Sequence, residues 1–185
     1  MNENLANKVC LITGATSGIG EESAKELNKM GAEIIFIARN EEKGNRLKQE
    51  LQNDSGREAT MIIADLSSQA EVKKAANEFL ALNKPLDILL NNAGIMNRER
   101  NETVDGFEEV FSVNHLAYYT FSILLAEKLK ETKESRVINV ASGAHQFVKD
   151  MNFEDLQSEE TFKPMQVYGQ SKLANILFTK SLAKK

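Results

Sequence analysis

A tyrosine and a lysine four residues apart, Tyr168 and Lys172, are the side chains of this sequence best suited to proton transfer. Residues at this spacing share one face of a helix, so the lysine ammonium can lie beside the phenol. A free phenol loses its proton only at about pH 10, and a neighbouring cation favours the phenolate. The pair could therefore exchange a proton with an alcohol or carbonyl oxygen near neutral pH. The alternative is a helix surface that carries an ordinary solvated lysine.

A second candidate site is the segment TGATSGIG, Thr13 to Gly20, which directly follows an apolar run. Gly14 would permit a tight turn, and Gly18 and Gly20 would let the backbone and the next helix approach a pyrophosphate. The N-terminus of that helix, which we expect to run to about Met30, supplies free N–H groups and partial positive charge. The spacing is G-x-x-x-G-x-G, whereas the general dinucleotide fingerprint is G-x-G-x-x-G, so a plain turn is the alternative.

The residues after the next two apolar runs bear on which dinucleotide would bind. An Asp or Glu at the end of the second run would bind a ribose 2′-hydroxyl, but the sequence there is Ala38-Arg39-Asn40. A guanidinium suits a 2′-phosphate, so Arg39 favours NADP (NADPH) over NAD, with a solvated loop arginine as the alternative. Asp65, which ends the third run, could bond the adenine or cap the following helix.

The elements that must position these residues are short β-rich runs alternating with longer helical patterns. The runs are continuously apolar, as in strands buried on both faces of a sheet. Between them, apolar residues recur at spacings of three and four, over 72–79 and over 107–125. This alternation predicts an α/β fold with a doubly wound, Rossmann-like parallel sheet, whose ligands bind at the carboxyl ends of the strands. The predicted strands are 9–13, 33–38, 60–64, 86–91 and 136–141.

Composition narrows the class of protein. The chain has 185 residues, 42% of them hydrophobic and 27% charged, which suits one globular domain. The net charge is −4, and acidic and basic residues are interspersed along the chain without a basic patch. We therefore expect no nucleic-acid partner. The one cysteine, Cys10, has no mate for a disulfide, and the two histidines have no ligand-like partners for a metal. With no signal-peptide pattern and no apolar run that spans a bilayer, we expect a cytoplasmic protein without a transmembrane segment.

Five segments occur together in the order and context of the short-chain dehydrogenase/reductases, which this chain resembles over nearly its whole length. ARNEEKG, SGAH and YGQSKLANILFTKSLA are most similar to the retinol-dehydrogenase and WW-domain-oxidoreductase branch of that family. The five segments are TGATSGIG, NNAG (91–94), VNH (113–115), VASGAH (140–145) and YGQSK (168–172).

This resemblance implies an NADP-dependent oxidoreductase that interconverts an alcohol and a carbonyl on a small-molecule substrate. Tyr168 would be the general acid/base, while Lys172 would assist it and hold the nicotinamide ribose. Ser142 would hydrogen-bond the reacting oxygen, and Asn114 would order a water in a proton relay. The hydride chemistry itself would be the cofactor's. The residues expected to line the cofactor are Gly14, Ser17, Gly18, Ile19, Gly20, Arg39, Asp65, Leu66, Asn92, Ala93 and Gly94, together with Tyr168 and Lys172.

The resemblance also sets an expectation about what the chain lacks. Members of the family continue beyond the helix that follows the fifth strand, with a sixth strand, a substrate-covering lid and a seventh strand. We therefore expect residues 1–185 to form a single dinucleotide-binding domain, truncated after that helix, with the fifth strand as an unpaired sheet edge. An alternative function is then a catalytically weak or inactive cofactor-binding or interaction domain.

Other expectations stay open at this point. A lipophilic substrate is suggested only by analogy with retinoid and steroid enzymes. A homo-oligomer is an expectation from relatives that pair through the helices holding Asn114 and Tyr168. A flavodoxin-like nucleotide-binding regulator would keep the fold but would leave the Tyr168–Lys172 pair without a role.

Overall fold

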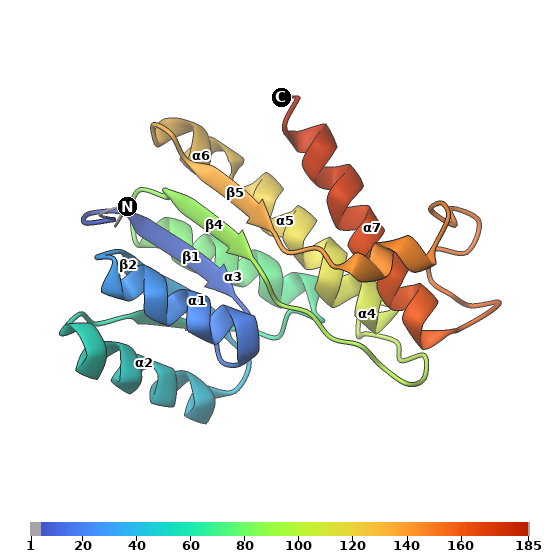
Figure 1. The fold of residues 1–185 in the computed structure, drawn as a ribbon, viewed down its shortest axis with the longest axis horizontal. Helices are drawn as coiled ribbons and strands as arrows, with labels where there is room; N and C mark the ends of the chain where they lie inside the picture. Colours follow the sequence, from blue (N-terminus) through green and yellow to red (C-terminus); the bar gives the residue numbers. More distant parts are fainter. Residues whose placement is uncertain (1–4, 185) are drawn as a thin grey trace.

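The computed structural model describes residues 5–184 and contains a five-stranded parallel sheet flanked by helices (Figure 1). The strand order is β3-β2-β1-β4-β5, so the order of strands reverses between β1 and β4. Sheets of this kind bind ligands at such a reversal, beyond the carboxyl ends of the strands. The predicted Rossmann-like fold class is confirmed. The strands are β1 (Val9–Thr13), β2 (Glu33–Ala38), β3 (Thr60–Ile63), β4 (Ile88–Asn91) and β5 (Arg136–Asn139).

Burial follows position in the sheet. The central strand β1 is buried along its whole length, and its successive side chains belong alternately to the core clusters on the two faces. The edge strands are less covered, with Ile63 of β3 42% exposed and Ile138 of β5 44% exposed. The prediction that all five runs are buried on both faces is therefore wrong for the two edges. The fourth and fifth strands are also each two residues shorter than predicted.

Helices cover both faces of the sheet (Figure 1). On one face α1 and α2 contribute Ala24 and Leu47 to the core, and on the other α3 and α5 contribute Phe79 and Phe121. The last helix, α7, packs against α4 (Glu109–Phe111) and the short turns η1 (Ser112–Leu116) and η2 (Gly143–Phe147). Within residues 5–184, no helix has both the length and the apolar character that crossing a membrane requires. The regular helices are α1 (Gly18–Lys29), α2 (Glu41–Ser55), α3 (Gln69–Ala81) and α7 (Pro164–Leu182).

The second helical pattern, predicted over 107–125, forms a composite helix. It consists of α4 (Glu109–Phe111), the π-helical turn η1 (Ser112–Leu116) and α5 (Ala117–Leu124), and α6 (Ala126–Glu131) follows Leu125. In η1 the N–H of Ala117 donates to the carbonyl of Ser112, five residues earlier. The predicted stripe nevertheless stays buried on both sides of this turn, at Val110, Asn114, Phe121 and Leu125. Leu124, which the stripe also predicts to be buried, is 39% exposed.

Candidate active site

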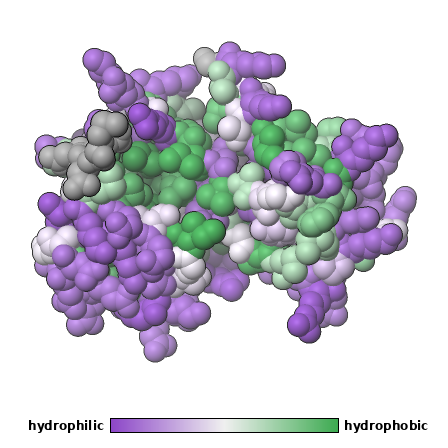
Figure 2. Space-filling model, in the orientation of Figure 1, coloured by the Kyte–Doolittle hydropathy of each residue, from purple (hydrophilic) through white to green (hydrophobic). Residues whose placement is uncertain are grey.

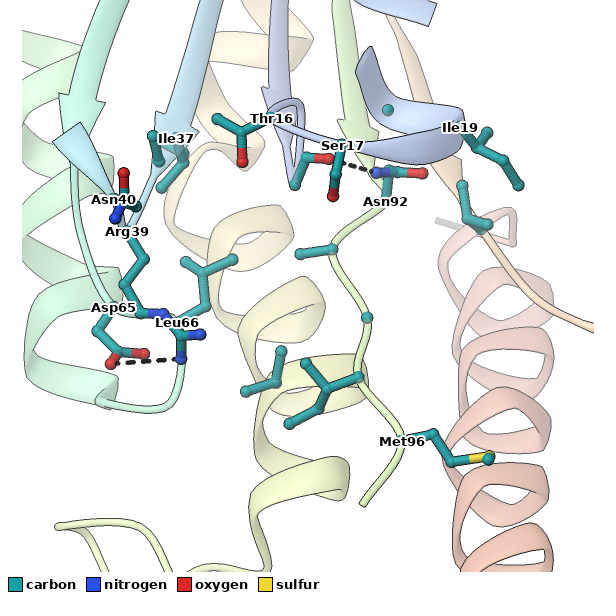
Figure 3. A pocket seen from close by; sticks show the side chains of 18 of the residues that line it. Thr16, Ser17, Ile19, Ile37, Arg39, Asn40, Asp65, Leu66, Asn92 and Met96 are labelled. Carbon is teal, nitrogen blue, oxygen red and sulfur yellow. Dashed lines mark hydrogen bonds and ion pairs between the residues drawn. The ribbon is translucent and has the colours of Figure 1, made fainter. Parts of the chain in front are cut away.

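A pocket of about 740 Å³ lies beyond the carboxyl ends of the strands, a size typical of small-molecule sites (Figure 3). It is lined by the segments that follow all five strands and by α7. Two of the predicted site residues, Gly18 and Asn114, lie outside its lining. The others line it: Gly14, Ser17, Ile19, Gly20, Arg39, Asp65, Leu66, Asn92, Ala93, Gly94, Ser142, Tyr168 and Lys172.

The glycine turn after β1 is too tightly packed for side chains at two positions. Gly14 has a φ of +67°, and a Cβ there would lie 2.6 Å from the Cα of Ala93. A Cβ on Gly20 would lie 2.2 Å from the carbonyl oxygen of Gly14. Ser17 precedes α1 as its N-cap, but its side chain makes no capping hydrogen bond. The first N–H groups of α1 thus border the pocket with partial positive charge, which fits a pyrophosphate.

The segment after β4 is tied directly to this turn. The Asn92 amide donates to the carbonyl oxygens of Thr13 and Gly14, each at 3.1 Å. The hydroxyl of Thr13 in turn accepts from the backbone N–H groups of Asn92 and Ala93, at 3.0 and 3.1 Å. The Asn92 side chain therefore holds the shape of the pocket floor. Thr13 begins the candidate segment TGATSGIG, but nothing in the sequence indicated this role for its side chain.

Two cationic side chains, Arg39 and Lys43, follow β2 and line the pocket. Arg39 is 68% exposed and its guanidinium lies 3.9 Å from the Asp65 carboxylate (Figure 3). The other oxygen of that carboxylate accepts from the N–H and hydroxyl of Ser67, both at 2.9 Å. Asp65 thus closes a turn, while the N-cap of α3 is Ser68. Lys43, the first lysine of α2, also lines the pocket and was not assigned from the sequence. Its position in a helix whose N-terminus faces the pocket could have identified it.

Ser142 and Tyr168 come from separate elements that are packed closely together. Ser142 is the N-cap of the 3-10 helix η2 (Gly143–Phe147), and its hydroxyl accepts from the Ala144 N–H at 3.2 Å. Tyr168 lies in the first turns of α7, whose start is favoured by Pro164. Next to it, Gly169 is so close to η2 that a Cβ would lie 2.7 Å from the Ala144 carbonyl oxygen. Both side chains line the pocket.

Lys172 is an almost fully buried lysine, 2% exposed. Its ammonium donates to the Val140 carbonyl oxygen at 3.2 Å and lies over the Tyr168 ring, 5.5 Å from the centroid. A second ring, that of Tyr118, lies 5.7 Å away. Burial lowers the pKa of Lys172 to about 8, because the charged form loses its hydration. The predicted proximity of the lysine to the tyrosine is present, and the ammonium faces the ring.

Tyr118 completes this environment and was missed by sequence reasoning. It is fully buried, and its hydroxyl donates to the Ala93 carbonyl oxygen at 2.7 Å. Burial strongly raises the pKa of Tyr118, with a smaller contribution from the negative charge that Tyr168 would carry, so this phenol stays protonated. Nothing in the spacing of Tyr118 from the known motifs signals a position beside Lys172. The two come together because α7 packs against η1, which leads directly into α5 and Tyr118.

Asn114 lies in η1, behind the pocket wall. Its amide donates to the Ile95 carbonyl oxygen and to the Ser171 hydroxyl, each at 3.0 Å, and accepts from the Ile95 N–H at 2.8 Å. A Cβ on Gly94 would lie 3.4 Å from the Lys172 ammonium and 3.5 Å from the Asn114 amide oxygen. Gly94 therefore lies beside both Lys172 and Asn114. Asn114 does not line the pocket, but its side chain holds the segment after β4 in place.

The sequence of this chain is similar to a known protein family. A family model for short chain dehydrogenase matches residues 8–185. Retinol dehydrogenase 12 from Mus musculus is 42% identical over 185 residues, and Polyprenol dehydrogenase from Homo sapiens is 36% identical over 181. These alignments cover 100% and 94% of this chain. The chain spans 58% and 54% of the lengths of these relatives.

Solved structures give the same picture of the fold. An uncharacterised protein from Mycobacterium paratuberculosis superposes with a TM-score of 0.85 at 36% identity, over 97% of this chain and 62% of that one. A short chain dehydrogenase from Escherichia coli CFT073, solved in complex with NADPH, superposes with a TM-score of 0.80 over 100% of this chain and 73% of that one. At 24% identity, the second likeness concerns the fold alone.

Proposed function

The chain belongs to the short-chain dehydrogenase family, and we propose that it takes part in an NADP(H)-dependent oxidoreductase that interconverts an alcohol and a carbonyl. One observation carries the proposal. A single pocket is lined both by the glycine turn after β1 and by Ser142, Tyr168 and Lys172. This arrangement would bring a bound dinucleotide from the turn toward the side chains suited to proton transfer.

In this proposal each side chain has a separate task. The nicotinamide, when bound, supplies or accepts the hydride. The Tyr168 hydroxyl gives a proton to the carbonyl oxygen or takes it from the alcohol, and Ser142 donates a hydrogen bond to the same oxygen. Lys172 contributes an ammonium over the Tyr168 ring, and two of its three N–H donors remain for cofactor hydroxyls beside the Val140 bond. A charged Lys172 stabilises negative charge on Tyr168 electrostatically.

The preference for NADP(H) rests on the side chains after β2. Arg39 is exposed and Lys43 lines the same part of the pocket, so two cations can approach a 2′-phosphate. Asp65 would give up its contact with Arg39 when a phosphate binds there. That contact is long, at 3.9 Å between exposed groups, and contributes little.

The proposed substrate is a lipophilic alcohol or its carbonyl partner. Support comes from the relatives, which are named for retinol and polyprenol. The chain spans little more than half of their length, so activity on such substrates is put forward as a proposal for the whole protein. A second candidate follows from the same fact, namely a domain that binds the cofactor but turns over slowly.

The test combines cofactor binding with turnover. NADPH and NADH are titrated by cofactor fluorescence, and reduction of retinal and other aldehydes is followed by loss of NADPH absorbance. Tyr168→Phe should remove turnover and leave the NADPH dissociation constant nearly unchanged, because only the proton-carrying oxygen is lost. Tyr119→Phe, at an exposed tyrosine of α5, is the matched control and should change neither. Turnover by Tyr168→Phe above a few per cent of wild type would refute the assigned role, and NADPH binding without turnover would favour the second candidate.

A further inference from the structure

Beyond Lys172, the buried face of α7 carries another polar residue that no part of the proposed reaction uses. Asn175 is fully buried and lies seven residues after Tyr168 and three after Lys172. Residues at these spacings share one face of a helix. The face of α7 that packs inward therefore bears a row of polar side chains where an apolar stripe would be expected. A buried polar group costs free energy unless its hydrogen bonds are made, so the partners of Asn175 matter.

Both ends of the Asn175 amide are bonded to η1. Its nitrogen donates to the Asn114 carbonyl oxygen at 2.8 Å, and its oxygen lies 2.9 Å from Nδ1 of His115. A carbonyl oxygen accepts only, so the amide nitrogen must face Asn114 and the amide oxygen must face His115. That oxygen is also an acceptor only. His115 must therefore carry its proton on Nδ1 when it is neutral.

The same π-helical turn is bonded to α7 a second time, one helical turn earlier. The Asn114 side chain donates to the Ser171 hydroxyl, which donates to the Tyr168 carbonyl oxygen at 2.7 Å. Asn114 is thus held through its main chain by Asn175 and through its side chain by Ser171. Two bonds spaced by four residues of α7 fix how far that helix can slide or rotate along η1. Lys172 lies between the two anchor points in the sequence.

The anchored residue also shapes the pocket. The Asn114 amide bonds both the N–H and the carbonyl of Ile95, and Ile95 lines the pocket after β4. A displacement of the Asn114 main chain would therefore move Ile95 and loosen the register of Tyr168 and Lys172 together. Apolar residues at 175 could fill the space, but they could not bond the Asn114 carbonyl.

We propose that Asn175 is a positioning residue, which clamps α7 to the π-helical turn so that Asn114 holds the wall of the cofactor pocket opposite Tyr168 and Lys172. The inference rests on the proposed function for its catalytic meaning. The geometry of the clamp, however, can be measured on the chain alone.

The experiment compares three variants by two measurements. Asn175→Ala removes both bonds, while Asn175→Asp keeps an acceptor for His115 and loses the donor for the Asn114 carbonyl. Asn28→Ala is the control, because Asn28 is an equally buried amide that joins α1 to α2 through Ser55, away from η1. Nitrogen NMR of the His115 ring reports its tautomer, and fluorescence titration gives the NADPH dissociation constant. Thermal unfolding of each variant shows the general loss of stability.

Wild-type His115 should show the Nδ1–H tautomer at neutral pH. Asn175→Ala should lose that preference, whereas Asn175→Asp should retain a proton on Nδ1. Both changes at 175 should raise the NADPH dissociation constant by about fivefold to tenfold, the equivalent of roughly one hydrogen bond. Asn28→Ala should lower the unfolding temperature comparably but leave the tautomer and the dissociation constant unchanged.

Other results overturn the inference. An Nε2–H tautomer in the wild type would refute the clamp geometry, and equal NADPH affinities for Asn175→Ala and Asn28→Ala would refute positioning. If the wild type bound no NADPH, the proposed function would fail by itself. The hydrogen bonds between Asn175 and η1 would then be tested by the His115 tautomer and by hydrogen exchange of the Ile95 amide. That exchange should accelerate in both variants at 175 and not in Asn28→Ala.

Discussion

Replacing Lys172 by methionine should stabilise the chain in the absence of cofactor. Lys172 is 2% exposed, and burial lowers its pKa from 10.5 to about 8. Below pH 8 the residue is charged in both folded and unfolded chains. Between about pH 8 and 10.5 only the unfolded chain holds the proton, so the free energy of unfolding rises with pH over that window. At about 1.4 kcal/mol per pKa unit, a shift from 10.5 to about 8 means that burying the ammonium costs about 3.5 kcal/mol below pH 8.

The assay is urea unfolding of wild type and Lys172→Met at pH 7 and at pH 10. At pH 7 the variant should be more stable by about 2–3 kcal/mol, after allowance for the lost Val140 hydrogen bond and ring contacts. At pH 10 the wild-type lysine is mostly neutral when folded, so the difference should shrink by about 2.5 kcal/mol. Lys180→Met, at an exposed lysine of the same helix, should change stability by less than about 0.5 kcal/mol at pH 7. A variant that is less stable than wild type at pH 7, or a difference that does not change with pH, would refute this account.

Three further predictions concern the cofactor site and the sheet edge. Arg39→Ala should weaken the binding of NADPH by about tenfold and leave the binding of NADH unchanged in parallel fluorescence titrations, because only the 2′-phosphate distinguishes the two cofactors. Equal affinities of the wild type for NADPH and NADH would contradict the NADP(H) preference. Gly20→Ala should destabilise the chain by about 1–3 kcal/mol in urea unfolding, because its Cβ would lie 2.2 Å from a backbone oxygen, whereas Gly143→Ala, which meets nothing within 4 Å, should be near neutral. Ile138→Lys should lower any self-association measured by sedimentation, because it places a charge on the edge strand β5. The control Val104→Lys, at an exposed valine outside the sheet, should not lower it. Equal effects of the two substitutions would show that the strand edge does not cause the self-association.

The parts of this fold that sequence predicts well are those with local causes. The run VCLIT predicts a buried strand because it is almost entirely apolar, and the glycines after it predict a tight turn, which Gly14 forms with a φ of +67°. Tyr168 and Lys172 could be paired because four residues make one helical turn. Each of these signals lies within about ten consecutive residues.

The parts that sequence did not predict depend on contacts between distant segments. The π-helical turn η1 has no local signature in SVNHL, and it becomes evident only through the widened bond from Ala117 to Ser112. Tyr118 lies beside the Lys172 ammonium, although the two residues are far apart in the sequence. The fully buried polar residue Asn175 likewise looks like an interruption of an apolar helix until its partners in η1 are known.

The exposed apolar side chains are a further feature that the sequence does not predict. Figure 2 shows hydrophobic surface interrupting the hydrophilic covering on one face of the molecule. Exposed apolar side chains include Phe147, Phe153 and Leu177, from η2, the segment before α7 and α7 itself. The sequence pattern cannot tell a buried apolar side chain from an exposed one when the covering element is not specified locally.

The close packing of Gly169 on the Ala144 carbonyl bears on the motion of the site as well as its shape. Backbone elements in a folded protein fluctuate by about 0.5 Å along each axis, and two that move independently vary in separation by about 0.7 Å. Productive proton transfer tolerates misplacement of only about 0.5 Å. Because Gly169 has no side chain, α7 can pack directly on the backbone of η2. We expect such a contact to correlate the fluctuations of Ser142 and Tyr168. Glycine at position 169 would in this way narrow the range of distances between the hydroxyls of Ser142 and Tyr168, the two groups that would bind the same substrate oxygen.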